Sequence, residues 1–275
     1  MNKIPLPEYE AVPMDDVAGG VRGLRIVMVN VFAISASSAG WTLVDTGLPL
    51  SADRIENWTR EYVGTGPRPN AIVLTHGHFD HVGALEELAE RWNVPVYAHE
   101  LELPYITGAA SYPKPDPTVG GGLMAMMSSL YPRGPVDAGL RATPLPANGS
   151  IPSLPGWRWI HTPGHTVGHV SLFRDSDGTL IAGDAFCTTR QESLLAVAQQ
   201  RPELHGPPAY YTTDWADAKA SVQRLAALNP TVIAPGHGLA MSGTQTSDAL
   251  QELAARFDEV ARPEQGRYIE HPTKA

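Results

Sequence analysis

The chain has 275 residues, of which 43% are hydrophobic and 18% are charged, and its formal net charge is -9. This composition predicts a folded globular protein, and the acidic balance without runs of like charge disfavours nucleic acid and anionic membranes as partners. The single cysteine, Cys187, cannot form an internal disulfide, and the sequence shows neither a signal-peptide core nor a run of about 20 apolar residues. We therefore expect a cytoplasmic protein that does not span a membrane.

The first half of the chain predicts strands followed by helices, after an irregular lead-in at residues 1–22. Runs rich in Val, Ile, Phe and Trp indicate strands, and apolar side chains at helical spacing indicate helices, the first with Ser51 as its N-cap. The expected strands are residues 26–35, 41–45, 71–75 and 94–98, with a hairpin-like turn at 37–40, and the expected helices begin near Ser51 and near Leu85.

The second half repeats this order of strands and helices, and no Pro/Gly/Ser-rich linker separates the two halves. Two such halves predict an α/β protein in which two β-sheets pack face to face with helices outside, an αββα sandwich formed by a single domain over residues 1–275. The expected strands are residues 157–161, 169–173, 179–182 and 231–234, and the expected helices are 211–228, capped by Thr213 or Asp214, and about 246–261.

Residues 104–148 interrupt the regular alternation with many prolines, three consecutive glycines and a short helical island at 123–131 that carries methionines. A long apolar insertion of this kind predicts a lid over a pocket. The alternative is a surface excursion whose methionines pack into the main core, because Met commonly fills gaps there.

Three histidines and an aspartate lie within six positions of a predicted strand-to-helix loop, at His76, His78, Asp80 and His81. With Gly77 in the loop, alternate side chains can turn to opposite sides of one cavity, so that His76 and His78 hold one ion while the other two reach a second. A solvated polar loop is the alternative, but further candidate ligands follow other apolar strands, each beside a glycine. These further candidates are His165, Asp184 and His237.

The order His-x-His-x-Asp-His, Gly-His, Gly-Asp and Gly-His resembles the metallo-β-lactamase superfamily over roughly residues 24–240. The resemblance implies the fold of that family and a metal-dependent hydrolase with two divalent ions. Zinc is the first expectation and iron or manganese the alternatives, since no cysteine stands at a ligand position. The implied ligands are His76, His78 and His165 for the first ion and Asp80, His81 and His237 for the second, with Asp184 as the bridge.

The implied reaction is the attack of a metal-bridging hydroxide on a carbonyl, with Asp80 and Asp184 as the catalytic carboxylates. Asp184 at the bridging position disfavours a true β-lactamase, the short segment after His237 disfavours a glyoxalase II-type thioesterase, and the acidic charge disfavours a nuclease. Lactonases of acyl-homoserine lactones share Gly-His-Thr-x-Gly-His, found here at 164–169, but carry a tyrosine where this chain has Cys187.

These comparisons leave a small ester, lactone or thioester as the expected substrate class. A redox or sensor protein on the same fold is the alternative from another class. The expected partners are a small-molecule substrate and, as one option, a second copy of the chain in a homodimer. If the insertion is a lid, its apolar side chains should line a pocket over the metals and set the preference for acyl tails. These side chains are Met124, Met126, Met127 and Leu130.

Several weaker candidates have two interpretations each. Asp45 resembles the family's aspartate that orients a ligand histidine, or it caps a turn. His169 is expected to be a hydrogen-bonded structural histidine rather than a ligand. Cys187 can approach the metals, although a buried inert thiol is favoured. Tyr210 and Tyr211 can contact substrate or protonate a leaving group, or they pack in the core.

Overall fold

The computed structural model describes residues 10–11, 14–35, 40–62, 68–200 and 203–273. The strands are β1 (Glu10–Ala11), β2 (Val21–Ile26), β3 (Val29–Ser35), β4 (Trp41–Val44), β5 (Ala71–Val73), β6 (Val96–Ala98), β7 (Ala142–Pro144), β8 (Trp157–His161), β9 (Val170–Arg174), β10 (Thr179–Gly183), β11 (Val232–Pro235) and β12 (Met241–Ser242). The α-helices are α1 (Ala52–Tyr62), α2 (Leu85–Trp92), α3 (Leu103–Ile106), α4 (Leu123–Met127), α5 (Leu194–Gln199), α6 (Trp215–Ala226), α7 (Thr244–Ala255), α8 (Phe257–Val260) and α9 (Arg267–Glu270).

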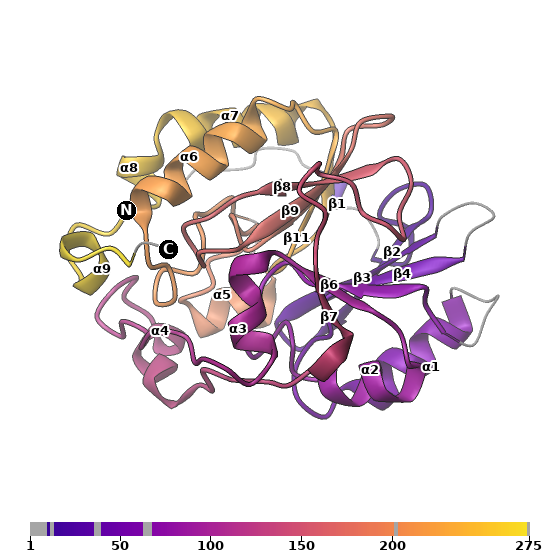
Figure 1. The fold of residues 1–275 in the computed structure, drawn as a ribbon. Helices are drawn as coiled ribbons and strands as arrows, with labels where there is room; N and C mark the ends of the chain where they lie inside the picture. Colours follow the sequence, from indigo (N-terminus) through magenta and orange to yellow (C-terminus); the bar gives the residue numbers. More distant parts are fainter. Residues whose placement is uncertain (1–9, 12–13, 36–39, 63–67, 201–202, 274–275) are drawn as a thin grey trace.

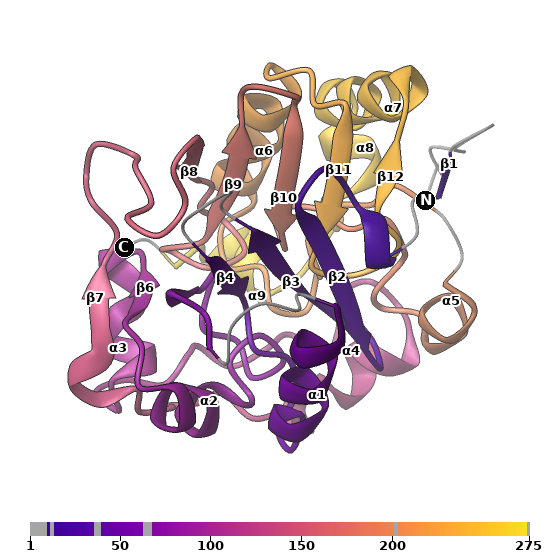
Figure 2. The same cartoon turned by 90° about the vertical axis from the view of Figure 1, so that its right-hand side faces the viewer.

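Two mixed sheets form the centre of the molecule (Figure 1). The first has the strand order β2-β3-β4-β5-β6-β7, with parallel pairing from β4 to β7, and the second has the order β1-β12-β11-β10-β9-β8, with one parallel pair, β10 and β11. Figure 2 shows α6, α7 and α8 on the outer side of the second sheet and α1 and α2 on the outer side of the first. The predicted αββα sandwich is confirmed.

Alternate side chains of the central strands enter different apolar layers. On β3, Phe32 and Ile34 pack between the two sheets, whereas Val29 and Val31 belong to the cluster that includes α1 and α2. Because both faces of such a strand are buried, its sequence is a continuous apolar run. The strands end in loops at one edge of the sandwich, where polar side chains gather.

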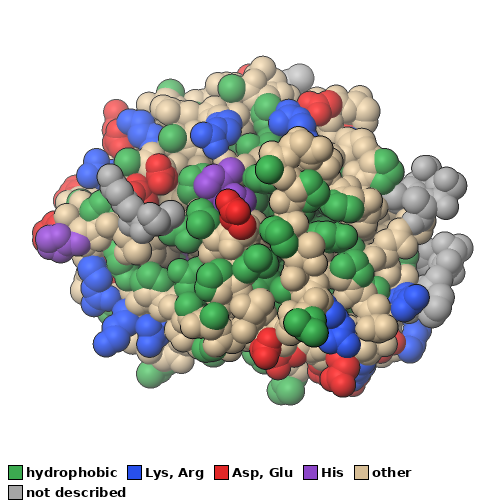
Figure 3. Space-filling view, viewed as in Figure 1, with side chains coloured by type: hydrophobic (Ala, Val, Ile, Leu, Met, Phe, Trp, Pro, Cys, Tyr) green, Lys and Arg blue, Asp and Glu red, His purple; other side chains and the backbone are tan. Residues whose placement is uncertain are grey.

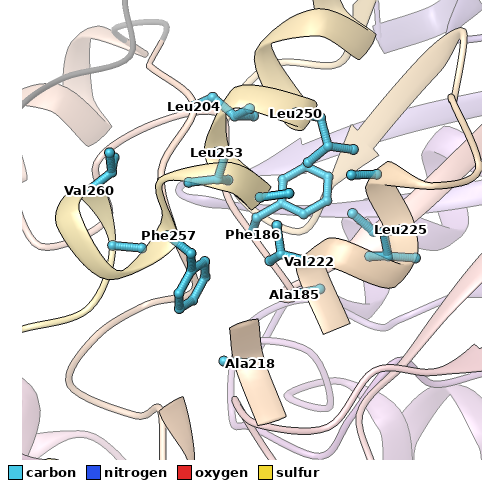
Figure 4. Close-up of a cluster of buried hydrophobic side chains, with 14 of the residues drawn as sticks. Ala185, Phe186, Leu204, Ala218, Val222, Leu225, Leu250, Leu253, Phe257 and Val260 are labelled. Atoms are coloured by element: carbon cyan, nitrogen blue, oxygen red, sulfur yellow. The ribbon is translucent and has the colours of Figure 1, made fainter. Parts of the chain in front are cut away.

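The C-terminal helices form the third apolar layer. Figure 4 shows Phe186, two positions after Asp184, pointing toward Leu250 on α7 and Val222 on α6. Phe186 and Leu250 are completely buried. The segment that follows the predicted bridging aspartate is therefore held by the apolar packing of α6 and α7.

The structure corrects two boundaries near the N-terminus. The predicted strand 26–35 begins only at Val29, as β3, because a two-residue turn after Ile26 separates β2 from β3. Val27 in this turn has φ 58° and is 72% exposed. The lead-in to residue 22 also ends too late, since β2 begins at Val21. Residues 1–9 and 12–13 of the lead-in, and residues 36–39 of the predicted turn 37–40, lie outside the described residues.

Later elements differ from prediction in a similar way. Helix α6 begins at Trp215 rather than 211, capped by Asp214, whose Oδ1 accepts hydrogen bonds from two backbone N–H groups at 2.9 Å each. The helix predicted at 246–261 is interrupted at Arg256, with φ -110° and ψ 22°. Within the insertion 104–148, the island is helical as predicted, but β7 was not expected. It is a three-residue edge strand that ends in Pro144 and carries no periodic signal.

No helix in the described part of the chain combines the length and the apolar character that a membrane span requires.

Truncation of the C-terminal core should destabilise the fold. Phe257 is completely buried between α7 and α8, so Phe257→Ala is expected to lower the free energy of unfolding by about 3 to 5 kcal/mol in urea denaturation. Leu140→Ala is the control, because Leu140 is fully exposed and its truncation should change that energy by less than about 0.5 kcal/mol. Equal effects of the two substitutions would contradict the core assignment.

Candidate metal centre

The seven predicted ligands lie together where loops leave the two sheets. The loop after β5 carries four of them, the loop between β8 and β9 carries His165, and Asp184 and His237 directly follow the parallel strands β10 and β11. All seven are buried, and the most exposed, Asp80, is 6% exposed. Residues separated by more than 150 positions in the sequence therefore share one buried cluster.

The possible ligand atoms fall into three overlapping sets, and within each set they lie within 4.8 Å of one another. Two of these sets coincide with the two ligand groups that the family resemblance implies, while the third joins Asp184 to one histidine of each group. The sets are His76, His78 and His165; Asp80, His81 and His237; and His76, His81 and Asp184. Ion binding by these sets stays a prediction.

The Asp184 carboxylate lies between the two groups. Its Oδ2 is 3.4 Å from His165 Nε2 and 3.1 Å from His237 Nε2, and its Oδ1 is 3.4 Å from His81 Nε2. A Cβ on Gly236 would lie 2.1 Å from Asp184 Oδ1, so only glycine leaves room for the carboxylate there. The glycine before His237 therefore gives Asp184 its central position.

Asp45 orients His81. Its Oδ2 lies 2.8 Å from His81 Nδ1, and its two oxygens accept the backbone N–H and the hydroxyl of Thr75, each at 2.8 Å. With Nδ1 donating to the Asp45 carboxylate, Nε2 of His81 faces Asp184. The geometry matches the orienting role that the resemblance implies for Asp45, and the same carboxylate also holds the start of the histidine loop.

Two further histidines are held through Nδ1. His237 Nδ1 donates to the Met28 carbonyl at 2.7 Å, and His165 Nδ1 lies 3.3 Å from Thr212 Oγ1. These contacts direct Nε2 of both rings into the cluster. His78 has the opposite orientation, since its Nδ1 lies 2.9 Å from His165 Nε2. The rings of His165 and His237 are thus fixed by groups outside the cluster.

Three buried atoms of the cluster have no hydrogen-bond partner: His76 Nε2, His81 Nε2 and Asp184 Oδ1. Buried polar atoms are normally paired, so three such atoms within one cluster indicate a ligand that is not part of the chain. The donors are imidazole nitrogens and carboxylate oxygens without sulfur, a set that suits zinc, iron or manganese. The residues present therefore fit divalent metal ions.

The protonation states of the cluster also suit metal binding. Burial and neighbouring imidazoles hold the pKa of His76 well below its usual value, and burial lowers the pKa of His165 to about 4, so both rings are neutral near pH 7. Burial opposes the charged form of Asp184, but His237 and His81 outweigh it and lower the pKa of that carboxyl. Burial likewise disfavours charge on His81, yet Asp184 and Asp45 raise its pKa, so a cation bound at His81 displaces a proton.

His169 and Cys187 are not members of any of these sets. His169 Nε2 accepts the backbone N–H of Asp184 at 2.8 Å, and its Nδ1 lies 2.8 Å from Thr162 Oγ1, which is the hydrogen-bonded structural position predicted for it. Burial, Asp184 and Glu192 raise the pKa of the Cys187 thiol well above its usual value, so the group stays protonated. A neutral buried thiol is inert, as expected.

Glu102, for which the sequence carries no signal, joins the two loops that carry His76, His78 and His165. It is completely buried. Its Oε2 accepts the Gly77 N–H at 3.0 Å and the Tyr112 hydroxyl, and its Oε1 accepts the Thr166 hydroxyl at 2.7 Å and the Gly168 N–H at 2.8 Å. No motif surrounds this glutamate, because its partners lie 10 to 66 positions away in the sequence.

A narrow pocket opens beside the first ligand group, and we call it the slot. It is narrow, and the empty space of about 340 Å³ in this region includes open solvent at its mouth. Tyr211 stacks on His78 with ring centroids 4.3 Å apart, and Tyr112 packs on the same ring at 4.5 Å. Its walls include His78, His165, Tyr105, Tyr112, Lys114 and Tyr211. The insertion 104–148 thus reaches the site through its tyrosines and Lys114.

The methionine island does not line the slot, so the expectation for its four apolar side chains is wrong there. Met126, Met127 and Leu130 are exposed, at 65%, 41% and 79%. Met124 alone is buried, and it belongs to the cluster of the second sheet, as the core-packing alternative expected. Tyr131, which follows the island, packs on Phe79 of the histidine loop with ring centroids 5.5 Å apart.

Comparison with known proteins assigns the family. A family model described as the metallo-beta-lactamase superfamily matches residues 24–237. The chain belongs to the metallo-β-lactamase superfamily. As a member of this superfamily it is a metal-dependent hydrolase, as the motif order predicts.

Relatives of known name extend over most of the chain. It is 44% identical over 259 residues to "Probable metallo-hydrolase YflN" of Bacillus subtilis, covering 94% of this chain and 98% of that protein. "Probable metallo-hydrolase YybB" of the same organism is 31% identical, covering 71% of this chain and 74% of its own length. Among solved structures, that of TTHA1623 in a di-iron-bound form aligns at 26% identity with a TM-score of 0.55, covering 83% of this chain and 96% of that one.

Removal of the Glu102 carboxylate should lower both the stability of the fold and the metal affinity of the cluster. Glu102→Ala leaves buried donors of both ligand loops without an acceptor, so the free energy of unfolding should fall by about 3 kcal/mol in urea denaturation. Zinc affinity, measured by competitive titration with a chelator, should fall about tenfold or more because His78 and His165 lose their relative position.

Glu100→Ala is the matched control, since Glu100 is an exposed glutamate of the same 3-10 helix. It should change neither quantity. Unchanged zinc affinity in a folded Glu102→Ala protein would show that Glu102 stabilises the fold without positioning the ligand loops.

Proposed function

We propose that the chain is a dinuclear metal-dependent hydrolase that cleaves a small ester, lactone or thioester. The observation that carries this proposal is the position of Asp184, whose oxygens lie within 3.4 Å of histidine nitrogens from both ligand groups. A carboxylate between two sets of three ligands is the arrangement that two neighbouring cations need in order to share one oxygen-donor side chain.

In this proposal His76, His78 and His165 hold one ion, Asp80, His81 and His237 hold the other, and Asp184 bridges them. Bound divalent ions polarise a carbonyl oxygen and lower the pKa of water toward neutrality. Asp80 is the most exposed group of the cluster and orients the attacking water through its carboxylate. Tyr211 and Tyr112 both pack on the His78 ring and keep bulk water from it.

Zinc is the proposed metal, because a set of imidazoles and carboxylates suits it and the chain offers no thiolate ligand. The similarity to TTHA1623, solved in a di-iron-bound form, supports iron as the alternative. An iron-loaded redox or sensor protein is accordingly the second candidate function. Three positions after Asp184, where acyl-homoserine lactonases carry a tyrosine, this chain has the buried thiol of Cys187. A lactonase reaction would therefore need a phenol from another residue, such as Tyr211.

The cluster draws ligands from loops of both sheets, which supports the proposal that residues 1–275 act as one domain with the insertion 104–148 as a cover over the site. The slot beside His78 and His165 is the proposed place of entry for a small-molecule substrate. Cytoplasmic location and a homodimer stay predictions from the sequence.

The metal content of the purified protein tests the dinuclear assignment. The wild-type chain should hold close to two ions by plasma mass spectrometry, and Asp184→Ala should lose most of the second ion and at least a hundredfold in rate, because the bridging carboxylate is removed. Asp248→Ala, an exposed aspartate on α7, should retain both ions and the wild-type rate. Full activity with a single ion, or an Asp184→Ala protein with both ions and the full rate, would rule out the bridge.

A panel of lactones, thioesters, aryl esters, β-lactams and phosphoesters tests the reaction class. Activity should be confined to one or more of the lactone, thioester and ester substrates, vanish on dialysis against a chelator, and return with zinc. Circular dichroism should show that the dialysed protein remains folded, since the ligands lie on loops outside the apolar layers. Activity confined to phosphoesters, or an oxidase activity that requires iron, would contradict the proposal.

A further inference from the structure

The walls of the slot are aromatic and rigid. Tyr105 stacks on Tyr112 with ring centroids 3.9 Å apart and an interplanar angle of 12°, and Tyr112 in turn packs on His78. Pro113 and Pro115 flank this wall. Walls of stacked rings leave a narrow opening, which favours a thin chain or a flat group over a branched one. The inner end of the slot reaches His78 and His165, so a molecule in the slot extends from the ligand rings to the surface.

Three cationic side chains converge on the segment at the mouth of the slot. Lys114 lines the slot and is exposed. Arg133 donates to the Tyr112 carbonyl at 3.0 Å, and Arg267 donates to the Lys114 and Pro115 carbonyls at 3.3 and 3.4 Å. These cations come from three separate parts of the chain. Figure 3 shows Lys and Arg side chains gathered at the lower left of this face, below α9.

No acidic side chain among the described lining residues offsets the positive charge at the mouth of the slot. None of the described residues that line the slot is Asp or Glu. The nearest acidic neighbour in the segment is Asp116, and its carboxylate is 4% exposed and already accepts the Arg267 N–H at 2.6 Å and the Thr118 N–H at 3.0 Å. The positive charge at the mouth of the slot is opposite in sign to the net charge of the whole chain, which is -9. Such a local departure favours an anion as the ligand.

We propose that the slot binds the part of the substrate away from the scissile carbonyl, and that this part is thin and ends in a negatively charged group that Lys114 recognises. The inference rests on the proposed hydrolase function and names its substrate class: an ester, lactone or thioester of an acid with a second anionic group. Arg133 and Arg267 hold the Lys114 segment. Arg133 adds to the positive potential at the mouth, whereas the neighbouring Asp116 carboxylate partly offsets the charge of Arg267.

Two para-nitrophenyl esters of equal chain length test this inference, the neutral hexanoate and the monoester of adipic acid, which ends in a carboxylate. The wild-type protein should show the lower KM for the adipate ester. Lys114→Ala should raise that KM about threefold to fivefold and leave kcat and the hexanoate KM unchanged, because Lys114 lies at the mouth and not at the reacting atoms. The difference should shrink as salt rises, since an exposed pair is screened.

Lys219→Ala is the matched control. Lys219 is a lysine on α6 that pairs with Asp258 outside the slot, so its removal changes the net charge equally and should leave the ratio of the two KM values at the wild-type value. The same ratio in all three proteins would overturn the anionic slot while the hydrolase function stands.

Binding of the free acids separates the two proposals if neither ester is cleaved, a result that would count against the hydrolase function for esters. By calorimetry, adipate should bind the metal-loaded wild type and Lys219→Ala proteins about threefold to fivefold more tightly than Lys114→Ala. Hexanoate, with its single carboxylate, should bind all three equally. Adipate binding that does not depend on Lys114 would refute the slot assignment.

Discussion

Burial of seven ionisable side chains at the shared edge of two sheets is the constraint on which the rest of this structure depends. Each such group costs free energy unless its charge is offset and its polar atoms are paired. Here the imidazoles near Asp184 offset its carboxylate, while Asp45 and the Met28 carbonyl satisfy the outward nitrogens of His81 and His237. Three atoms of the cluster are left unpaired, and such buried atoms indicate a ligand from outside the chain.

The side chains of Asn30 and Glu102 hold the loops of the first sheet in position against the loops of the second. Asn30 on β3 donates to the Pro235 carbonyl at 2.9 Å and to the Gly238 carbonyl at 2.8 Å, on either side of His237. On the other side, Glu102 accepts hydrogen bonds from both ligand loops of the first group. Apolar packing between the sheets is non-directional and tolerates small sliding movements, whereas these hydrogen bonds fix the loops by direction as well as distance. The spacing of the ligand atoms therefore depends on them.

The sequence predicts the local part of this arrangement and misses the part formed by distant residues. The histidine loop at 76–81 is readable because its side chains are close in sequence, and the strands are readable because both of their faces are buried. The turn at Val27 could not be predicted, because the apolar run that indicates a strand continues through it. Glu102 and Tyr112 act through partners far along the chain, and neither has a distinctive neighbour sequence. The exposure of Met126 likewise follows from packing that composition does not specify.

The narrowness of the site moves substrate selection away from the metal ligands. Asp80 is only 6% exposed, and Tyr211 covers one face of His78, so a substrate meets the slot before it meets the ligands. At physiological salt, charges more than about 8 Å apart are largely screened, and the net charge of -9 is therefore felt weakly at the mouth. Lys114, together with Arg133 and Arg267, which donate to carbonyls of the 112–115 segment, lies much nearer to a molecule at the mouth than most of the acidic groups do. Selection by charge at the mouth and by thickness between the tyrosine walls can then change without altering the ligand set, because Lys114 touches none of the ligand atoms.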